Sequence, residues 1–259
     1  MRFFWISFIA SFLIQIANGQ NQTNNTFTQD FASIFAEGKV QDTIGFMLAP
    51  EENLNIKLKQ EIKSELGHLI AELKEKKKKY KSDMYYLNKV SKTLFSKYFK
   101  TYEPLSTFGE TMTSGKYDCL TGTLLFAYVL EHLGYDYNIH ETNYHIYLTI
   151  PTDKRLILIE STDPYYGFIV NKGTVKTRMA QYQKDNQQLD NQEDVYQPKY
   201  KINNTIAIEK LMALQYYNKA IKFYNERNFE KAATNVQKSM VVYDCERNKE
   251  LLSMIVQNR

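Results

Sequence analysis

Apolar side chains recur every three or four residues along two stretches of the chain, Leu58–Leu73 and Met84–Phe99. This spacing places them on one face of a helix. We therefore expect residues 31–99 to be helical, with Pro104 closing this part of the chain. A further helix is predicted over residues 118–133 by the same spacing.

The predicted helix 118–133 carries its own start and stop signals. Asp118 is placed to accept hydrogen bonds from the first turn, and Gly134 is placed to end the helix. Beyond it, residues 135–141, 144–150 and 156–160 are rich in Tyr and Ile and read as three short strands. Helices followed by antiparallel strands indicate an α+β fold.

From residue 183 onward the chain has a polar segment followed by a segment with helical spacing. Residues 183–205 are polar and read as a linker or loop. Residues 206–259 have helical spacing, interrupted at residues 225–228, and resemble one tetratricopeptide unit, in which two helices pack through small residues. A plain helical hairpin is the alternative. The small positions are Ala220, Ala232 and Ser239, and the large apolar positions are Tyr216, Phe223, Phe229 and Val236.

The first 19 residues differ from all that follow. Arg2 precedes an apolar run over residues 3–16, and small residues follow before Gln20. This is the pattern of a cleaved signal peptide over residues 1–19, with a polar lead over residues 20–30. A membrane anchor is the alternative, but the run is shorter than the roughly 20 residues that span a bilayer. We expect a periplasmic or secreted protein with no membrane-spanning segment after cleavage.

Composition and charge exclude several kinds of function. The net charge is +4, and the basic run at residues 74–81 reads as a solvated helix face, so we expect no nucleic-acid partner. The four histidines and two cysteines lack metal-ligand spacing. No phosphate-binding loop or serine-hydrolase motif occurs. We expect neither a metal nor another cofactor.

Cys119 is the candidate nucleophile. It begins the predicted helix 118–133, where the unpaired N–H groups and the helix dipole favour an anion such as a thiolate. Two alternatives are open. Cysteine is among the most frequently buried residue types, and in an oxidising compartment Cys119 could pair with Cys245.

His145 is the candidate base and Glu160 the candidate acid. One register of the predicted hairpin sets these two residues directly opposite each other, with Cβ atoms about 5 Å apart. The carboxylate would then orient the imidazole. A register shifted by one residue places Ser161 there instead, and Asp163 is the alternative acid.

The order of these features resembles the core of the transglutaminase-like, papain-related cysteine enzymes. The matching parts are Gly115 with Cys119, Leu133-Gly134, His145-Ile146-Tyr147 and the apolar run Leu156–Thr162. The resemblance implies a domain over residues 31–182 in which Cys119, His145 and Glu160 form a catalytic triad.

What the resemblance implies about activity is an amide-bond hydrolase or acyl transferase. Attack of the thiolate on a peptide, protein or cell-wall amide would give a thioester that water or an amine resolves. The Cys119 backbone N–H would donate to the oxyanion. The rival hypothesis is a catalytically degenerate domain that binds a peptide or protein partner through its C-terminal helices.

Overall fold

The computed structural model describes residues 35–36, 39–52, 54–185 and 201–258. The chain divides into two compact units, residues 1–46 and the residues from Met47 onward. The predicted signal peptide 1–19 and polar lead 20–30 lie outside the described residues. Among the helices that the structure describes, none has the length and apolar character needed to cross a membrane.

In the first unit, strands β1 (Phe35–Ala36) and β2 (Lys39–Val40) form an antiparallel pair. The short helix α2 (Thr43–Leu48) follows, and its last two residues belong to the second unit. The expectation of helix from residue 31 is therefore wrong for these two strands. The three-and-four spacing on which it rested begins only at Leu58, so no periodic apolar face favoured helix there.

In the second unit, two long helices confirm the predicted apolar faces. Helix α3 (Ile56–Lys77) buries Leu66 and Leu73, and helix α4 (Asp83–Tyr98) buries Leu87 and Leu94. Burying such a face against a neighbouring element is what stabilises helices of this length in proteins. The chain then forms strand β3 (Thr101–Tyr102) and the short helix α5 (Phe108–Thr113).

Helix α6 (Cys119–His132) begins and ends where the sequence predicts. The Asp118 carboxylate accepts from the Thr121 N–H at 2.8 Å, and the Thr121 hydroxyl accepts from the Asp118 N–H at 3.1 Å. This reciprocal pair satisfies two N–H groups of the helix start. Gly134 ends the helix with φ of +75°, a conformation that other residues avoid.

Strand β4 (Lys116–Tyr117) pairs in parallel with β3 and leads the chain into α6. Gly115, just before it, has φ of +77°, and a Cβ there would overlap the Lys100 side chain. A residue with a side chain would have to move one of these segments. The glycine therefore fixes how the chain enters the helix that carries Cys119.

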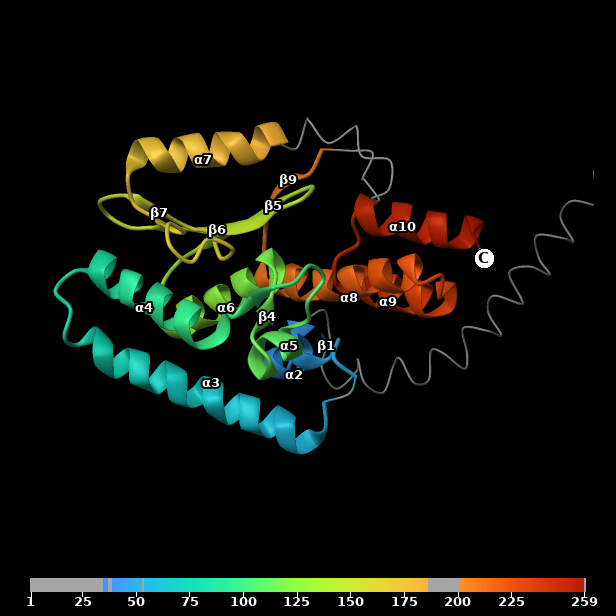
Figure 1. Cartoon of the computed structure of the whole chain (residues 1–259), viewed down its shortest axis with the longest axis horizontal. Helices are drawn as coiled ribbons and strands as arrows, with labels where there is room; N and C mark the ends of the chain where they lie inside the picture. Colours follow the sequence, from blue (N-terminus) through green and yellow to red (C-terminus); the bar gives the residue numbers. More distant parts are fainter. Residues whose placement is uncertain (1–34, 37–38, 53, 186–200, 259) are drawn as a thin grey trace, which may run out of the picture. The chain divides into compact units, whose positions relative to one another are not determined.

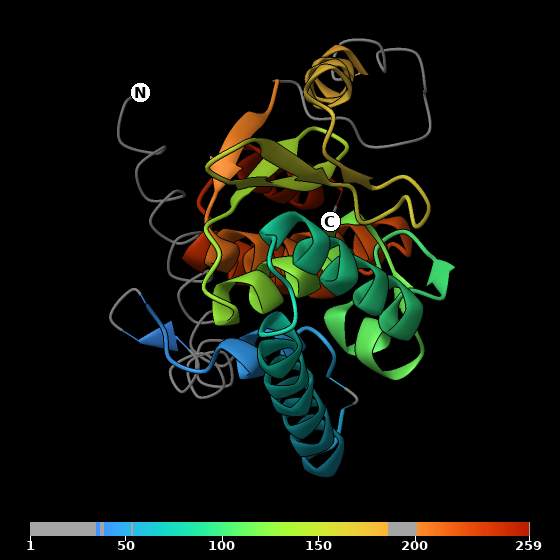
Figure 2. The same cartoon turned by 90° about the vertical axis from the view of Figure 1, so that its left-hand side faces the viewer.

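Five strands form one antiparallel sheet in the order β8-β7-β6-β5-β9. Helix α6 packs on one face, and helix α7 (Lys172–Asp185) packs on the other (Figure 1). Figure 2 shows the same layering along a second direction. This mixed helix and sheet arrangement confirms the α+β class. The strands are β5 (Asn138–Thr142), β6 (Ile146–Pro151), β7 (Leu156–Ile159), β8 (Phe168–Ile169) and β9 (Asn203–Ile206).

The predicted register of the hairpin between β6 and β7 is wrong by two residues. Pro151 pairs with Leu156 at its closed end, whereas the predicted register set His145 directly opposite Glu160. A shift of two residues leaves every side chain on its original face of the sheet. His145 and Glu160 are thus diagonal neighbours on one face, a separation that long side chains still bridge.

Strand β9 lies in the segment 183–205 that was expected to be a linker or loop. Its residues Asn203–Thr205 are exposed, and only Ile206 is buried. They are held at the sheet edge by antiparallel pairing with β5. Backbone pairing, and not the burial of alternate side chains, holds β9 in place. Its sequence therefore lacks the alternation of apolar residues that predicts a strand. Residues 186–200 of the segment lie outside the described part.

Three helices follow: α8 (Ile208–Asn225), α9 (Phe229–Val242) and α10 (Glu246–Gln257). The break expected at residues 225–228 is confirmed, with φ of +58° at Arg227. Helix α8 packs on both α9 and α6. The C-terminal helices therefore contact the helix that carries Cys119.

Candidate functional site

Cys119 is the first residue of α6 and is partly exposed. It lies in a cleft of about 200 Å³ that His145 also lines. Both cysteines are free thiols, so the alternative disulfide between Cys119 and Cys245 is absent. The structure therefore brings the candidate nucleophile and the candidate base to one cleft.

A close approach of two backbones holds α6 against the end of β7. A Cβ on Gly122 would lie 2.8 Å from the Cβ of Ser161, closer than such atoms can pack. The Ser161 hydroxyl donates to the Cys119 carbonyl oxygen at 3.3 Å. Gly122 thus lets the first turn of α6 sit beside the residue that follows Glu160.

His145 ends the turn between β5 and β6, where its carbonyl oxygen accepts from the Thr142 N–H at 2.9 Å. Its imidazole Nε2 lies 2.5 Å from Glu160 Oε2. The Glu160 side chain is only 3% exposed, and that of His145 is 20% exposed. The candidate base and acid therefore form a short, largely buried contact.

Glu160 is held by three other side-chain and backbone contacts. Its Oε1 accepts from the Thr162 N–H at 2.9 Å and from the Thr162 hydroxyl at 2.6 Å. Its Oε2 accepts from the Tyr182 hydroxyl of α7 at 2.5 Å. Burial disfavours the charged carboxylate, but His145, Thr162 and Tyr182 together lower the pKa of Glu160 to about 2. Glu160 is ionised at neutral pH.

The alternative acid, Asp163, is engaged elsewhere. Its Oδ1 accepts from the backbone N–H of Tyr166 at 2.8 Å and of Tyr165 at 3.3 Å. These contacts close the turn that follows Glu160. Glu160, and not Asp163, is the carboxylate that contacts His145.

The two neighbours of His145 set its protonation. Burial alone would lower the pKa of His145, but hydrogen bonding and charge from Cys119 and Glu160 outweigh burial and raise that pKa to about 10. The imidazolium form of His145 is therefore stabilised beside Cys119 and Glu160. The arrangement can supply a proton donor at neutral pH in the same cleft as the Cys119 thiol.

Sequence reasoning missed several residues around this site. Tyr182 packs its ring 4.7 Å from that of His145, and Tyr102 also lines the cleft. Burial, followed by the negative charges of Cys119, Asp118 and Glu160, raises the pKa of Tyr102 to about 12. Helices α8 and α10 supply another wall, through Tyr217, Asn218, Ile221 and Arg247. Only the folded chain brings these residues together, because no local motif marks them.

Among the described residues, no group of three or more His, Cys, Asp or Glu side chains is arranged to hold a metal ion. No protein-family model matches the sequence, and no significant match occurs among curated proteins or solved structures.

Proposed function

We propose that this chain is an exported, cysteine-dependent amide-bond hydrolase or acyl transferase of the transglutaminase-like type. The observation that carries the proposal is the contact of His145 with buried Glu160 in the cleft that also holds Cys119. Packing of α6 on an antiparallel sheet supports the same class. The acid of the proposed triad is Glu160.

The proposed reaction proceeds through a thioester. The Cys119 Sγ attacks the carbonyl carbon of an amide, and the resulting oxyanion accepts a hydrogen bond from the Cys119 N–H. The C–N bond breaks as the His145 imidazolium gives its proton to the leaving amine. Water or a second amine, deprotonated by neutral His145, then attacks the thioester and releases Cys119. Glu160 orients the imidazole and stabilises its cation throughout.

We further propose that α8 and α9 form a tetratricopeptide-like hairpin that binds part of the peptide or protein substrate. Ala220, Ala232 and Ser239 have 0% exposure, which is in keeping with two helices in close contact. Helix α8 also supplies Tyr217 and Asn218 to the cleft. A substrate seated on Cys119 would therefore touch this hairpin.

The test measures alkylation of Cys119 by iodoacetamide from pH 5 to 8, on protein recovered from a secreting host. Cys119 should react rapidly below pH 7, where an ordinary thiol of pKa about 8.5 is almost unreactive. Cys245 is the internal control, since burial raises the pKa of its thiol. In His145→Ala the reactivity of Cys119 at low pH should largely vanish.

Two results would contradict the proposal. If Cys119 reacts no faster than Cys245 across this pH range, it is not an activated nucleophile. The hypothesis of a catalytically degenerate binding module is then favoured. The intact mass of the same preparation tests export, because a product that begins near Gln20 is expected. A product that retains residues 3–16 would contradict signal cleavage.

A further inference from the structure

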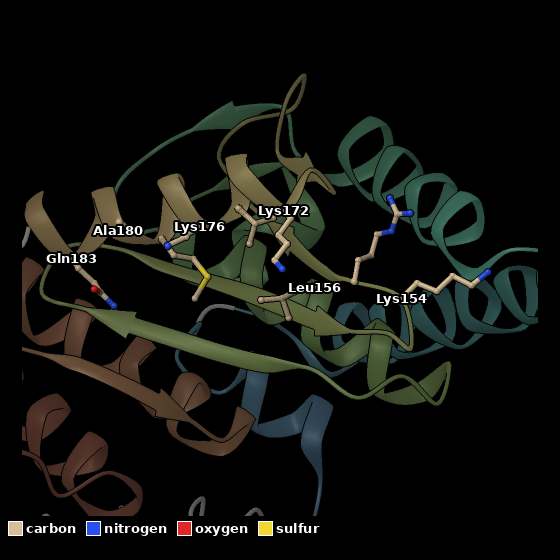
Figure 3. Close-up of a pocket in the computed structure, with 9 residues that line it drawn as sticks. Lys154, Leu156, Lys172, Lys176, Ala180 and Gln183 are labelled. Carbon is tan, nitrogen blue, oxygen red and sulfur yellow. The ribbon is translucent and has the colours of Figure 1, made fainter.

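A second groove, of about 620 Å³, lies beside α7 on the face of the sheet away from α6. One side is formed by α7, and the other is formed by the turn at Lys154–Arg155 and by Leu156 of β7. Figure 3 shows Lys154 and Leu156 toward one end, Ala180 and Gln183 toward the other, and Lys172 and Lys176 along the helix between them. The groove is separate from the cleft of Cys119.

The lining residues of α7 occupy a single face of the helix. They are residues 172, 175, 176, 179, 180 and 183, which recur at steps of three and four. At a rise of 1.5 Å per residue this face is about 16 Å long. Its centre is apolar: Val175 belongs to the buried cluster under the helix, and Met179 packs against that cluster.

The charged lining residues are all positive. They are Lys154, Arg155, Lys172 and Lys176, with no acidic residue among the lining positions. None of the four takes part in an ion pair between described residues. Lys154 and Arg155 also line a neighbouring depression beyond the turn, together with Asp83 and Asp153. Lys172 is the first residue of α7, where the helix dipole is positive, and Lys154 and Arg155 lie in the turn at the same end of the groove.

We propose that this groove binds a single-chain anionic amphiphile, such as a medium-chain fatty acid. The carboxylate lies near Lys154, Arg155 and Lys172, and the hydrocarbon chain runs along Val175, Met179 and Ala180. The inference is independent of the proposed function.

An acidic peptide fits this groove less well. The carboxamide of Gln183 is the only uncharged polar side chain among its lining residues. A bound peptide backbone would therefore bury N–H and C=O groups with few partners, which is costly. A hydrocarbon chain has no such groups to satisfy.

The experiment measures displacement of a fluorescent fatty-acid analogue by monomeric laurate or myristate at physiological ionic strength. The triple variant Lys154→Gln, Arg155→Gln, Lys172→Gln should bind about tenfold more weakly or worse. A matched variant, with the same charge change at the exposed residues Lys63, Lys89 and Lys92 of α3 and α4, should stay within about twofold.

A second variant tests the position of the chain without any change in charge. Ala180 is exposed in the groove, so Ala180→Trp should fill it and weaken myristate binding by about tenfold, with the melting temperature unchanged. The alcohol of equal chain length should bind more weakly than the acid. The proposal is overturned if both triple variants weaken binding equally, if Ala180→Trp binds normally, or if only anionic vesicles or acidic peptides bind.

Discussion

A single carboxylate organises the site at the scale of residues. Glu160 accepts hydrogen bonds from Thr162 and Tyr182 and contacts His145 at 2.5 Å, although its side chain is only 3% exposed. A carboxylate with this many donors remains charged in a buried place. That charge is available to stabilise an imidazolium. Its removal should therefore change the pKa of His145.

The pKa of His145 should therefore depend on Glu160. In Glu160→Gln the negative charge is lost, so we expect the pKa of His145 to fall from about 10 toward the ordinary imidazole value of 6.5. NMR titration of the imidazole measures this change. Asp163→Asn is the matched control and should leave the pKa nearly unchanged. A larger fall in the Asp163 variant would show that the wrong acid has been assigned.

Glu160 and His145 contribute to the stability of the fold over different pH ranges. The folded-state pKa of Glu160 is depressed to about 2, so its contribution is present above pH 4.5 and is lost as pH falls through about 2. The folded-state pKa of His145 is raised to about 10, so its contribution is present below pH 6.5 and is lost as pH rises through about 10. The free energy of unfolding is measured with urea. In Glu160→Gln it should fall less than in the unaltered chain as the pH approaches about 2 or about 10.

At the scale of elements, the ends of helix α6 could be predicted from the sequence, whereas the register of the hairpin between β6 and β7 could not. The ends of α6 follow from Asp118 and Gly134, which act within one turn of the chain. The hairpin register depends on how the turn closes, and here the Thr152 hydroxyl donates to the Arg155 carbonyl oxygen at 2.7 Å. That contact closes a turn over residues 152–155, so Pro151 pairs with Leu156. Composition shows that a turn occurs, but not which residues close it.

The contact between α8 and α9 should be sensitive to side-chain volume. Ala232 is completely buried, so Ala232→Leu should overpack the helices and cost about 1–3 kcal/mol in the free energy of unfolding. The neighbouring Ala233 is only partly buried, and Ala233→Leu is the matched control. Thermal and urea unfolding measure both. Equal stability of the two variants would mean that the helices do not meet tightly at Ala232.

At the scale of the second unit, Gln215 joins helix α8 to two segments that are distant in sequence. Its Oε1 accepts from the Phe108 N–H of α5 at 2.8 Å, and its Nε2 donates to the Met47 carbonyl oxygen at 3.2 Å. Lys219, one turn later, donates to the Pro50 carbonyl oxygen at 2.6 Å. The C-terminal helices are thereby tied to the beginning of this unit.

Loss of these contacts should destabilise the whole unit. In Gln215→Leu the N–H of Phe108 and the carbonyl of Met47 lose their side-chain partner, which should cost about 1–3 kcal/mol. Gln237→Leu, at an exposed position of α9, is the matched control. Circular dichroism should report a lower melting temperature for the first variant with one cooperative transition. Separate transitions for the C-terminal helices would contradict this coupling.

The candidate site shows the same limit of sequence reasoning. Cys119, His145 and Glu160 could be singled out because each lies at a recognisable start or end of an element. Tyr182 could not, because nothing near it in sequence indicates that α7 lies over the His145 side of the sheet. The residues that α8 and α10 bring to the cleft escaped notice for the same reason, since contacts across long sequence separations leave no local pattern.

The residues that line the cleft are far apart in sequence, so they are synthesised at different times. A chain emerging from the ribosome presents Cys119 well before Tyr217 and Arg247, which line the same cleft. Domains generally fold as units once their parts are available. Until α10 has been made, the thiol is thus without part of its final surroundings. A nascent chain should therefore complete the cleft around Cys119 only after α10 has left the ribosome.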